Sequence, residues 1–364
     1  MRTSTFFSFL VAASLSVAAP VPKADVAVEQ LGSRATLPDI INVNVKNLYP
    51  EDGVYDWDRQ IYYQSNLWKG LISTWKRTDS SHFNVKIDGV SSSGDGSQQM
   101  AGLSLDNIRG ASKLYAVAKP ADAFRFDAVH DQGPCSFHSF SLPLSANSKP
   151  LWSVDLRPVQ AAFQAKYGKR PYGNVASAQD KSGNSYVIFA LGAPAIAKVS
   201  ADGKTVEPWF LENGNGGQRP GYTGVTYLPD IDAIVAFGGP RPLTLFRFSD
   251  ATPTAHAVTV RGSFGSLDGT EKIKTVPSQN NSGYRLVGAK APQIYSFAST
   301  DGWNSVTFKT FTRNEFNSNS LTSIVEGKNG GQSGIFGTGA YFGEGAHGGR
   351  TTFPAYRIDN SLLN

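Results

Sequence analysis

The sequence is poor in cysteine, in charge and in long apolar runs, and each shortage excludes a class of protein. Cys135 is the only cysteine, so the chain cannot form an internal disulfide, and we expect this thiol to be buried. Charged residues make up 17% of the chain, against about 25% in an average soluble protein. The basic residues form no block, which argues against a nucleic-acid-binding protein. After residue 19, no stretch approaches the roughly 20 apolar residues of a transmembrane helix.

The N-terminus has the pattern of a secretory signal. Arg2 precedes an apolar run from Phe6 to Val17, and small residues at positions 17–19 have the spacing of a signal-peptidase site. We therefore predict a signal peptide over residues 1–19, a flexible leader over 20–36 and a folded domain over 37–364. This reading predicts a secreted protein, extracellular or associated with the cell wall. Asn280, in the sequence Asn-Asn-Ser, is a candidate glycosylation site.

The sequence is rich in glycine, proline and aromatic residues, and it repeats. Its 37 glycines and 20 prolines punctuate short alternating strands. Similar units start near residues 53, 102, 174, 224, 269 and 321, at intervals of 49, 72, 50, 45 and 52 residues. A period near 50 residues with three or four strands per unit is typical of a β-propeller. We predict an all-β, six-bladed β-propeller, since a large sandwich would not repeat in this way.

Two segments fall outside the repeat. The long second interval contains a pattern of apolar residues with Pro158 near its start and Gly168 at its end, which predicts one short helical insertion near residues 155–168. The strand-like segment from Ile40 to Lys46 precedes the first unit. We predict that it joins the sheet of the last blade and closes the ring, because this would pair an otherwise open edge.

Common catalytic motifs are absent. The chain has neither a G-x-S-x-G nor an H-E-x-x-H sequence. Residues 343–348 match G-x-G-x-x-G, but the following segment contains Pro354 and cannot open the helix that a dinucleotide site needs. His130 and His138 flank Cys135, and we interpret them as surface histidines of a loop rather than as a Cys/His metal site.

Polar residues gather where the innermost strand of each blade is expected to begin, which is where propellers place their central funnel. The candidate ligand-binding residues there are Glu51, Gln99, Tyr172, Arg219, Tyr222, Glu271 and Asn319. They could line a binding pocket. Alternatively, they could be the hydrated lining of a structural channel in which the charges of Glu51, Arg219 and Glu271 neutralise one another.

Several segments resemble the Malassezia major allergen family. The matching stretches are residues 47–52, 62–70, 80–85, 94–100, 136–140, 142–145, 214–222, 236–241, 269–273 and 345–350. A looser resemblance extends to a fungal protein of trichothecene toxin clusters. The resemblance implies a secreted fungal six-bladed propeller at the cell surface, bound by IgE in sensitised hosts, with no established enzymatic reaction. It also implies lipid binding, phosphoinositide headgroups included, and a link to virulence through the trichothecene-cluster relative.

A more distant similarity, to six-bladed lactonases, supplies an enzymatic alternative. Those enzymes hold a divalent cation through a glutamate that opens the first blade, and Glu51 stands at the matching place. Asp268 matches a second ligand position, whereas Ala101 and Thr223 stand where the lactonases have Asn or Asp. Calcium prefers six or more oxygen ligands, so the set is incomplete. The alternative function is a divalent-metal-dependent, lactonase-like hydrolase using Glu51 and Asp268, with calcium as its ion.

The main hypothesis is a non-enzymatic binder without a cofactor. The guanidinium of Arg219 offers a planar donor fork for a phosphate or carboxylate, and Tyr172 and Tyr222 offer apolar walls. We therefore predict a monomer that takes a small amphipathic or anionic ligand, such as a phosphorylated lipid, in the central funnel. A third possibility is that the outer rim binds host or wall components, IgE among the host proteins, while the funnel is structural.

Overall fold

The computed structural model describes residues 37–121, 133–212, 221–278, 283–329, 332–358 and residue 361. The predicted signal peptide and leader lie outside these residues, as do Arg219, Asn280 and His130.

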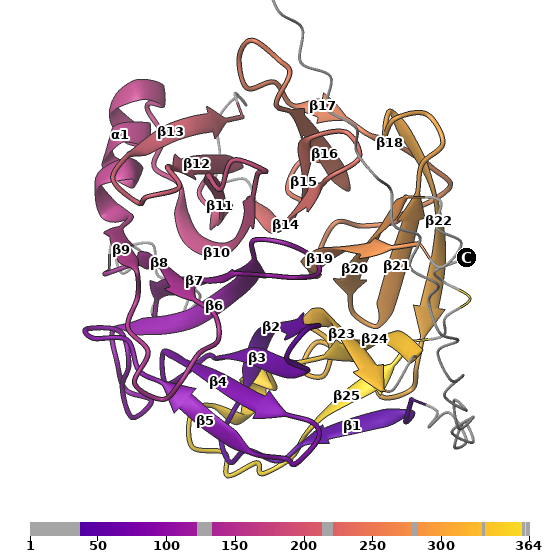
Figure 1. Ribbon diagram of the computed structural model, residues 1–364. Helices are drawn as coiled ribbons and strands as arrows, with labels where there is room; N and C mark the ends of the chain where they lie inside the picture. The colour runs from indigo at the N-terminus through magenta and orange to yellow at the C-terminus, as the bar shows by residue number, and fades with distance from the viewer. Residues whose placement is uncertain are drawn as a thin grey trace, which may run out of the picture. The chain divides into compact units, whose positions relative to one another are not determined.

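Within the described residues, the strands form six sheets arranged around a common centre (Figure 1). In each of the first four sheets the strands follow one another from the centre outward as an antiparallel meander. Given from the innermost strand outward, these four sheets are β2 (Pro50–Asp56), β3 (Ile61–Asn66), β4 (Leu71–Lys76) and β5 (His82–Val85); β6 (Gln98–Leu105), β7 (Lys113–Pro120), β8 (Ser136–Ser141) and β9 (Trp152–Asp155); β10 (Tyr172–Gln179), β11 (Ser185–Leu191), β12 (Ala195–Val199) and β13 (Val206–Leu211); and β14 (Tyr222–Leu228), β15 (Ala233–Gly238), β16 (Leu243–Arg247) and β17 (His256–Ala257).

The last two sheets depart from this plan at their outer edges. The fifth has a short parallel edge strand, β18, beside β22, and the sixth takes the N-terminal strand β1. Their strands, again from the centre outward, are β19 (Thr270–Pro277), β20 (Tyr284–Lys290), β21 (Gln293–Ala298), β22 (Ser305–Thr312) and β18 (Thr259–Arg261); and β23 (Ser323–Asn329), β24 (Gln332–Thr338), β25 (Phe353–Arg357) and β1 (Ile40–Val43).

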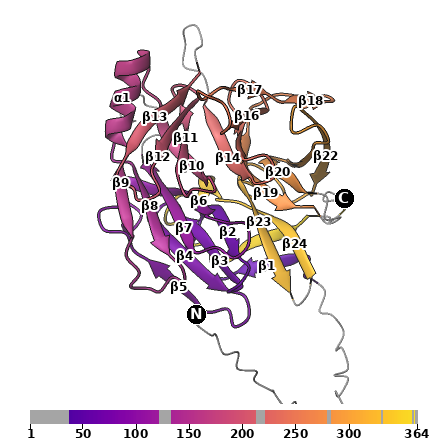
Figure 2. The ribbon, with the colours of Figure 1, turned by 45° about the horizontal axis from the view of Figure 1, so that its top comes forward.

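The innermost strands contact one another in chain order, and β23 returns to β2 to complete the ring (Figure 2). The fold is therefore the predicted six-bladed β-propeller. Each inner strand begins within four residues of the unit start read from the sequence. The turn residues predicted the positions of the blades well, because Gly, Pro, Asn and Asp determine where a short strand can begin and end.

The N-terminal strand closes the ring as predicted. β1 pairs antiparallel with β25, placing Ile41 opposite Ala355. The guanidinium of Arg313 reinforces the closure by pairing with Asp39 at 2.8 Å. The last blade thus combines both ends of the folded chain, which leaves no unpaired edge at β25.

The predicted insertion forms α1 (Arg157–Tyr167). Pro158 lies in its first turn, and Gly168 ends it in the left-handed conformation, with φ of 69°. The helix packs against β13 at the outer edge of the third blade, and its Phe163 meets Phe189 of β11 edge-on at 5.9 Å. No helix in the described part of the chain has the length and hydropathy needed to span a bilayer.

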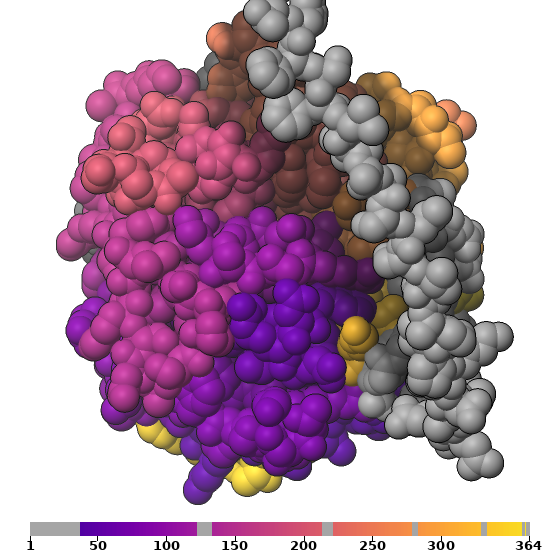
Figure 3. Space-filling view, viewed as in Figure 1, coloured from indigo at the N-terminus to yellow at the C-terminus, as the bar shows by residue number. Residues whose placement is uncertain are grey.

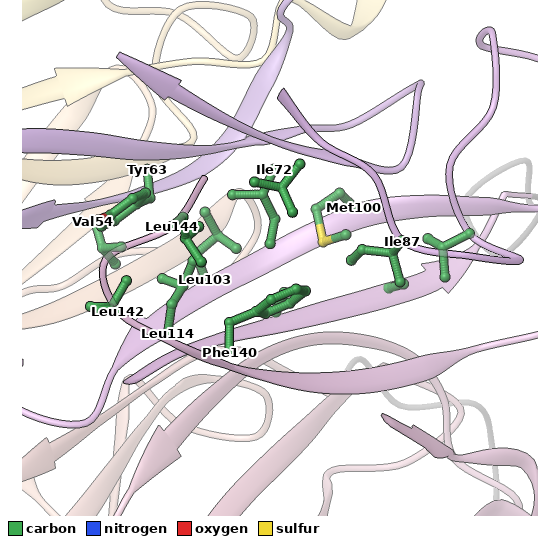
Figure 4. Packing of buried hydrophobic residues seen from close by; sticks show 14 of the residues in the cluster. Val54, Tyr63, Ile72, Ile87, Met100, Leu103, Leu114, Phe140, Leu142 and Leu144 are labelled. Carbon is green, nitrogen blue, oxygen red and sulfur yellow. The ribbon is translucent and has the colours of Figure 1, made fainter. Parts of the chain in front are cut away.

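The hydrophobic core lies mainly between blades rather than at one centre. Figure 4 shows the cluster between the first two blades, in which Val54 and Tyr63 face Leu103 and Phe140. In the space-filling view the indigo and purple surfaces of these blades meet along a shared border (Figure 3). Each blade therefore buries apolar surface against both neighbours, which no blade could do alone.

Cys135 is buried as predicted, and burial raises the pKa of its thiol to about 12. The interpretation of His138 as a surface residue is wrong. Its side chain is buried on β8 between the hydroxyls of Ser136 and Ser153, each 2.8 Å from one ring nitrogen. Burial lowers the pKa of this imidazole to about 4, so it is neutral near pH 7. The alternation of β8 places His138 on the same buried face as Phe140.

Glycine is needed where inner strands of neighbouring blades approach each other. A Cβ on Gly102 would lie 2.3 Å from the carbonyl oxygen of Val175, and one on Gly224 would lie 2.8 Å from that of Glu271. Both glycines adjoin register shifts in their inner strands. The bulges bend the strands around the axis, and the missing side chains let the backbones pass.

Candidate functional site

The predicted funnel residues that the structure describes do not form one group. Tyr222 is fully buried in the core, and its hydroxyl donates to Glu212 at 3.2 Å. The ring of Tyr172 packs over Gly192, and Asn319 is exposed with its side-chain oxygen accepting from the amide of Gly343. Gln99 is buried on β6. Only Glu51 and Glu271, on β2 and β19, share an electrostatic environment among these residues.

Glu51 lies in an ionic cluster at the centre of the ring. Its carboxylate accepts from the ammonium of Lys119 at 2.7 Å and from that of Lys272 at 3.4 Å. All three side chains are at most 4% exposed. Lys272 also donates to the carbonyl of Val175 at 3.0 Å, so the cluster connects the first, second, third and fifth blades.

Asp52 continues this cluster on the same strand. Its carboxylate pairs with Lys274 at 2.9 Å and accepts from the amide of Leu103 at 3.0 Å. The hydroxyl of Ser323 donates to it as well. Asp52 therefore connects the first blade to the second, fifth and sixth, and each of its oxygens has a donor, as a buried carboxylate requires.

Burial controls the protonation of this centre. Loss of solvation raises the pKa of Glu271 to about 7, and the negative charge of Glu51 adds to the shift, while the neighbouring lysines oppose it. Burial also lowers the pKa of Lys119, against the opposing pull of Glu51. The cluster is therefore sensitive to pH near neutrality.

A cavity of about 550 Å³ adjoins the cluster. Its lining comes mainly from the six inner strands and the turns that follow them, and it includes none of the predicted funnel residues that the structure describes. Asp52, Lys272 and Lys274 form its inner end, and the turns around Asp106 and Asp180 contribute to its rim.

The wall of this cavity, which we call the channel cavity, alternates apolar and hydroxyl groups. Aliphatic residues of every inner strand line it, among them Val54, Ala176 and Ile324. Hydroxyl pairs complete it: Ser104 with Ser177 at 2.8 Å, and Thr226 with Thr275 at 2.9 Å. This mixture suits a ligand that has both an apolar and a polar part.

A further carboxyl, that of Glu326, lines the same cavity. Glu326 accepts from the indole nitrogen of Trp57 at 2.6 Å, and the guanidinium of Arg109 lies 4.1 Å from the centre of that indole. Burial raises the pKa of Glu326 to about 7 despite these partners. Glu326 can therefore act as either a hydrogen-bond donor or an acceptor near neutral pH.

Sequence reasoning missed Lys119, Lys272, Lys274 and Glu326. Lys272 and Lys274 carried a usable signal, because two lysines two residues apart in an inner strand lie on the same face. Lys119 and Glu326 carried none, since each meets its partner only after the ring has closed.

The sequence of this chain matches a family of fungal allergens. The family described as Mal s 1 allergenic protein-like matches residues 27–321. The chain belongs to the Mal s 1-like family. One relative, the major allergen Mal f 1 of Malassezia furfur, is 53% identical over 330 residues, which cover 91% of this chain and 94% of that protein. Core trichothecene cluster protein 14 of Fusarium sporotrichioides is 24% identical over 288 residues, or 76% of this chain and 71% of that protein.

Solved structures agree with the Mal s 1-like assignment. The crystal structure of the major Malassezia sympodialis allergen Mala s 1 is 52% identical, with a TM-score of 0.86, and the match covers 90% of this chain and 98% of that one. A gluconolactonase from Xanthomonas campestris has a TM-score of 0.51 at 10% identity over 88% of this chain and 89% of its own, a likeness in fold alone. The resemblance read from the sequence motifs is confirmed.

The residues of this Mal s 1-like chain do not fit a calcium ion. Glu51 faces two ammonium groups, which occupy the space and neutralise the charge that a cation would need. Asp268 lies in an exposed turn, where it accepts from the hydroxyl of Ser266 at 2.8 Å. Among the residues that the structure describes, no cluster of three or more His, Cys, Asp or Glu side chains could hold a metal. Glu51 and Asp268 therefore have separate surroundings and do not form the paired cation ligands of the lactonase-like alternative.

Proposed function

We propose that this Mal s 1-like protein binds a small amphipathic molecule with a polar or anionic head in the channel cavity, without catalysis. The supporting observation is the combination, in one cavity of about 550 Å³, of aliphatic walls with the ammonium of Lys274 at the inner end. This volume is within the about 300–1,000 Å³ of pockets that hold drug-sized ligands. The apolar part of the ligand packs on the strand walls, and its head faces Lys274.

The ionic cluster makes the binding of an anionic head dependent on pH. Glu51, Asp52 and Glu271 stand against Lys119, Lys272 and Lys274, so the cluster is neutral when all are charged. Protonation of Glu271 below about pH 7 removes one negative charge from the cluster. We therefore expect an anionic ligand to bind more tightly below pH 7 than above it.

The cellular setting completes the proposal. The N-terminal pattern of residues 1–19 supports secretion, to the medium or to the cell wall. The similarity to a major allergen supports recognition of this chain by IgE of sensitised hosts, and with it a role in host interaction. Both expectations are tested by locating the protein in fractionated cultures and by IgE binding to the purified protein.

The binding proposal is tested by native mass spectrometry of the secreted protein beside its denatured form. We expect an excess mass of lipid size that denaturation removes. The Lys274→Met variant should lose most of this mass, because it removes the ammonium at the inner end of the cavity. The control Lys149→Met changes a lysine that is 65% exposed and should keep it. A bare polypeptide mass, or equal retention by both variants, would contradict the proposal.

A further inference from the structure

A second hollow, separate from the ionic cluster, lies between the third and fourth blades. Its volume is about 240 Å³, and it is lined by strands β11, β12 and β13, the end of β16, the turn before β11 and the loop after β16. We call it the inter-blade groove. We propose that the inter-blade groove binds a neutral pyranose ring, the unit from which polysaccharides are built.

Three aromatic side chains form one side of the groove. Tyr186 lies 4.8 Å from both Trp209 and Phe248, measured between ring centres, and Trp209 lies 6.2 Å from Phe248. Tyr186 is buried beneath the two partly exposed rings. The axial C–H groups of a pyranose carry partial positive charge and pack on the negative face of an aromatic ring, so such a cluster is a suitable platform for a sugar.

The backbone of β13 directs Trp209 into the groove. The pairing of β12 with β13 shifts register between Ile196 and Ala197, which leaves Trp209 as an extra residue in β13. In a regular strand, Trp209 and Phe210 would point to opposite faces of the sheet. Here both rings pack on Phe246 of the fourth blade, with centres 5.5 and 4.7 Å away. A bulge that re-aims a side chain in this way is frequent beside binding sites.

The polar lining is balanced in charge. Asp180 and Asp250 contribute two carboxylates, and Lys198 and Arg247 contribute two cations. A charged ligand therefore gains little over a neutral one. A polyol can use all four groups, since its hydroxyls donate to carboxylates and accept from ammonium and guanidinium groups.

Neighbouring groups hold these side chains in place. Asp180 accepts from the hydroxyl of Tyr186 at 3.1 Å and from the side-chain amide of Asn184 at 2.9 Å. One oxygen of Asp250 lies 2.7 Å from Nε2 of His256, and Arg247 donates through one terminal nitrogen to the carbonyl of Gly302 at 2.6 Å. The remaining oxygen of Asp250 and the other guanidinium nitrogens face no described partner, so they are available to a ligand.

The size of the groove limits the ligand to a single ring. Its volume is below the about 300–1,000 Å³ of pockets for drug-sized molecules. Asp180 also lines the channel cavity, so the two hollows share a wall, but the aromatic platform belongs to the groove alone. We therefore expect recognition of one exposed or terminal sugar unit.

Saturation-transfer NMR on the intact secreted protein tests this proposal. The probes are the methyl glycosides of β-glucose, α-mannose, β-galactose and β-N-acetylglucosamine. We expect transfer to the ring protons of at least one of them, with a dissociation constant in the millimolar range. Trp209→Ala should weaken that binding at least tenfold, and Trp209→Phe should retain part of it.

A blocking variant separates loss of the site from loss of the fold. Ala251 is exposed and lines the groove, so Ala251→Phe fills the hollow without removing a core contact. We expect it to abolish transfer, whereas Ala161→Phe, at an exposed position of α1, should leave it unchanged. The channel variant Lys274→Met should also leave it unchanged. Absence of transfer to every probe, or transfer that survives Ala251→Phe, would overturn the proposal.

Discussion

The centre of the ring and the spaces between neighbouring blades are both buried, yet they are filled by opposite kinds of side chain. Between blades, residues such as Leu114 and Phe140 bury apolar surface, whose contribution is about 25 cal/mol per Å² and depends little on orientation. At the centre, Glu51 and Asp52 meet lysines of the second and fifth blades. Desolvation offsets most of the attraction in such pairs, so their net contribution to stability is small.

The two regions therefore contribute to the fold in different ways. The apolar spaces supply the free energy of folding, and many side chains of similar volume would serve there. The ionic centre tolerates no missing partner, because a lone buried charge is expensive. We therefore expect the ionic centre to determine which blades lie next to each other. The inter-blade cores should supply most of the free energy of folding.

The largest expected effect comes from breaking the ionic centre. Glu51→Ala removes the carboxylate that pairs with the buried ammonium groups of Lys119 and Lys272 and should lower the free energy of unfolding by about 3–5 kcal/mol. Equilibrium unfolding in urea measures this change. The exposed pair of Lys149 and Asp88, 3.0 Å apart, is the control: Asp88→Ala should change stability by less than about 0.5 kcal/mol. Equal effects of the two variants would remove the distinction between buried and exposed pairs.

A core substitution tests the other side of the comparison. Leu114 is 0% exposed between the first two blades, and Leu114→Ala should cost about 2–5 kcal/mol through lost burial and the cavity left behind. Leu151, which is 55% exposed, provides the matched control, since Leu151→Ala should have almost no effect in the same urea titration. If Leu114→Ala were as mild as its control, the cores between blades would not carry the stability.

The smallest effect is a change in pH dependence. Glu271 is ionised in the unfolded chain above its ordinary pKa of 4.5, but in the folded protein it keeps its proton until about pH 7. The folded state therefore holds the extra proton between these values, and stability falls as pH rises through this window. Glu271→Gln cannot ionise and should flatten that fall. Thermal unfolding below pH 4.5 and above pH 7 measures this change in stability. The control variant Glu207→Gln changes an exposed glutamate and should keep the wild-type dependence on pH. A wild-type slope in Glu271→Gln would show that this carboxyl does not titrate there.

Local sequence patterns predicted most of the fold. Alternation and turn residues located the inner strands to within four residues, and Pro158 and Gly168 delimited α1. The closing strand β1 was predictable because an apolar strand before the first repeat has one unpaired edge available to it. These features depend on residues close together in the chain, whose conformational preferences do not require knowledge of the rest.

The site was less predictable, because its partners are distant in sequence. Glu51 was recognised as a funnel residue, but Lys272, which is 221 residues away, was not recognised as its partner. Tyr222 looked like an aromatic wall and is instead a core residue, since the side of a strand that faces the channel depends on bulges that the sequence does not mark.

The sequence by itself determined the number of blades, their order, the helical insertion and the membership of the Mal s 1-like family. Only the tertiary structure decided which charges meet at the centre, where the cavity opens, and that Trp209 turns toward the fourth blade. The physical reason is the distance along the chain between the residues that interact. Strands and turns follow from the conformational preferences of neighbouring residues, whereas desolvation and pairing of a side chain depend on whatever the closed ring brings against it.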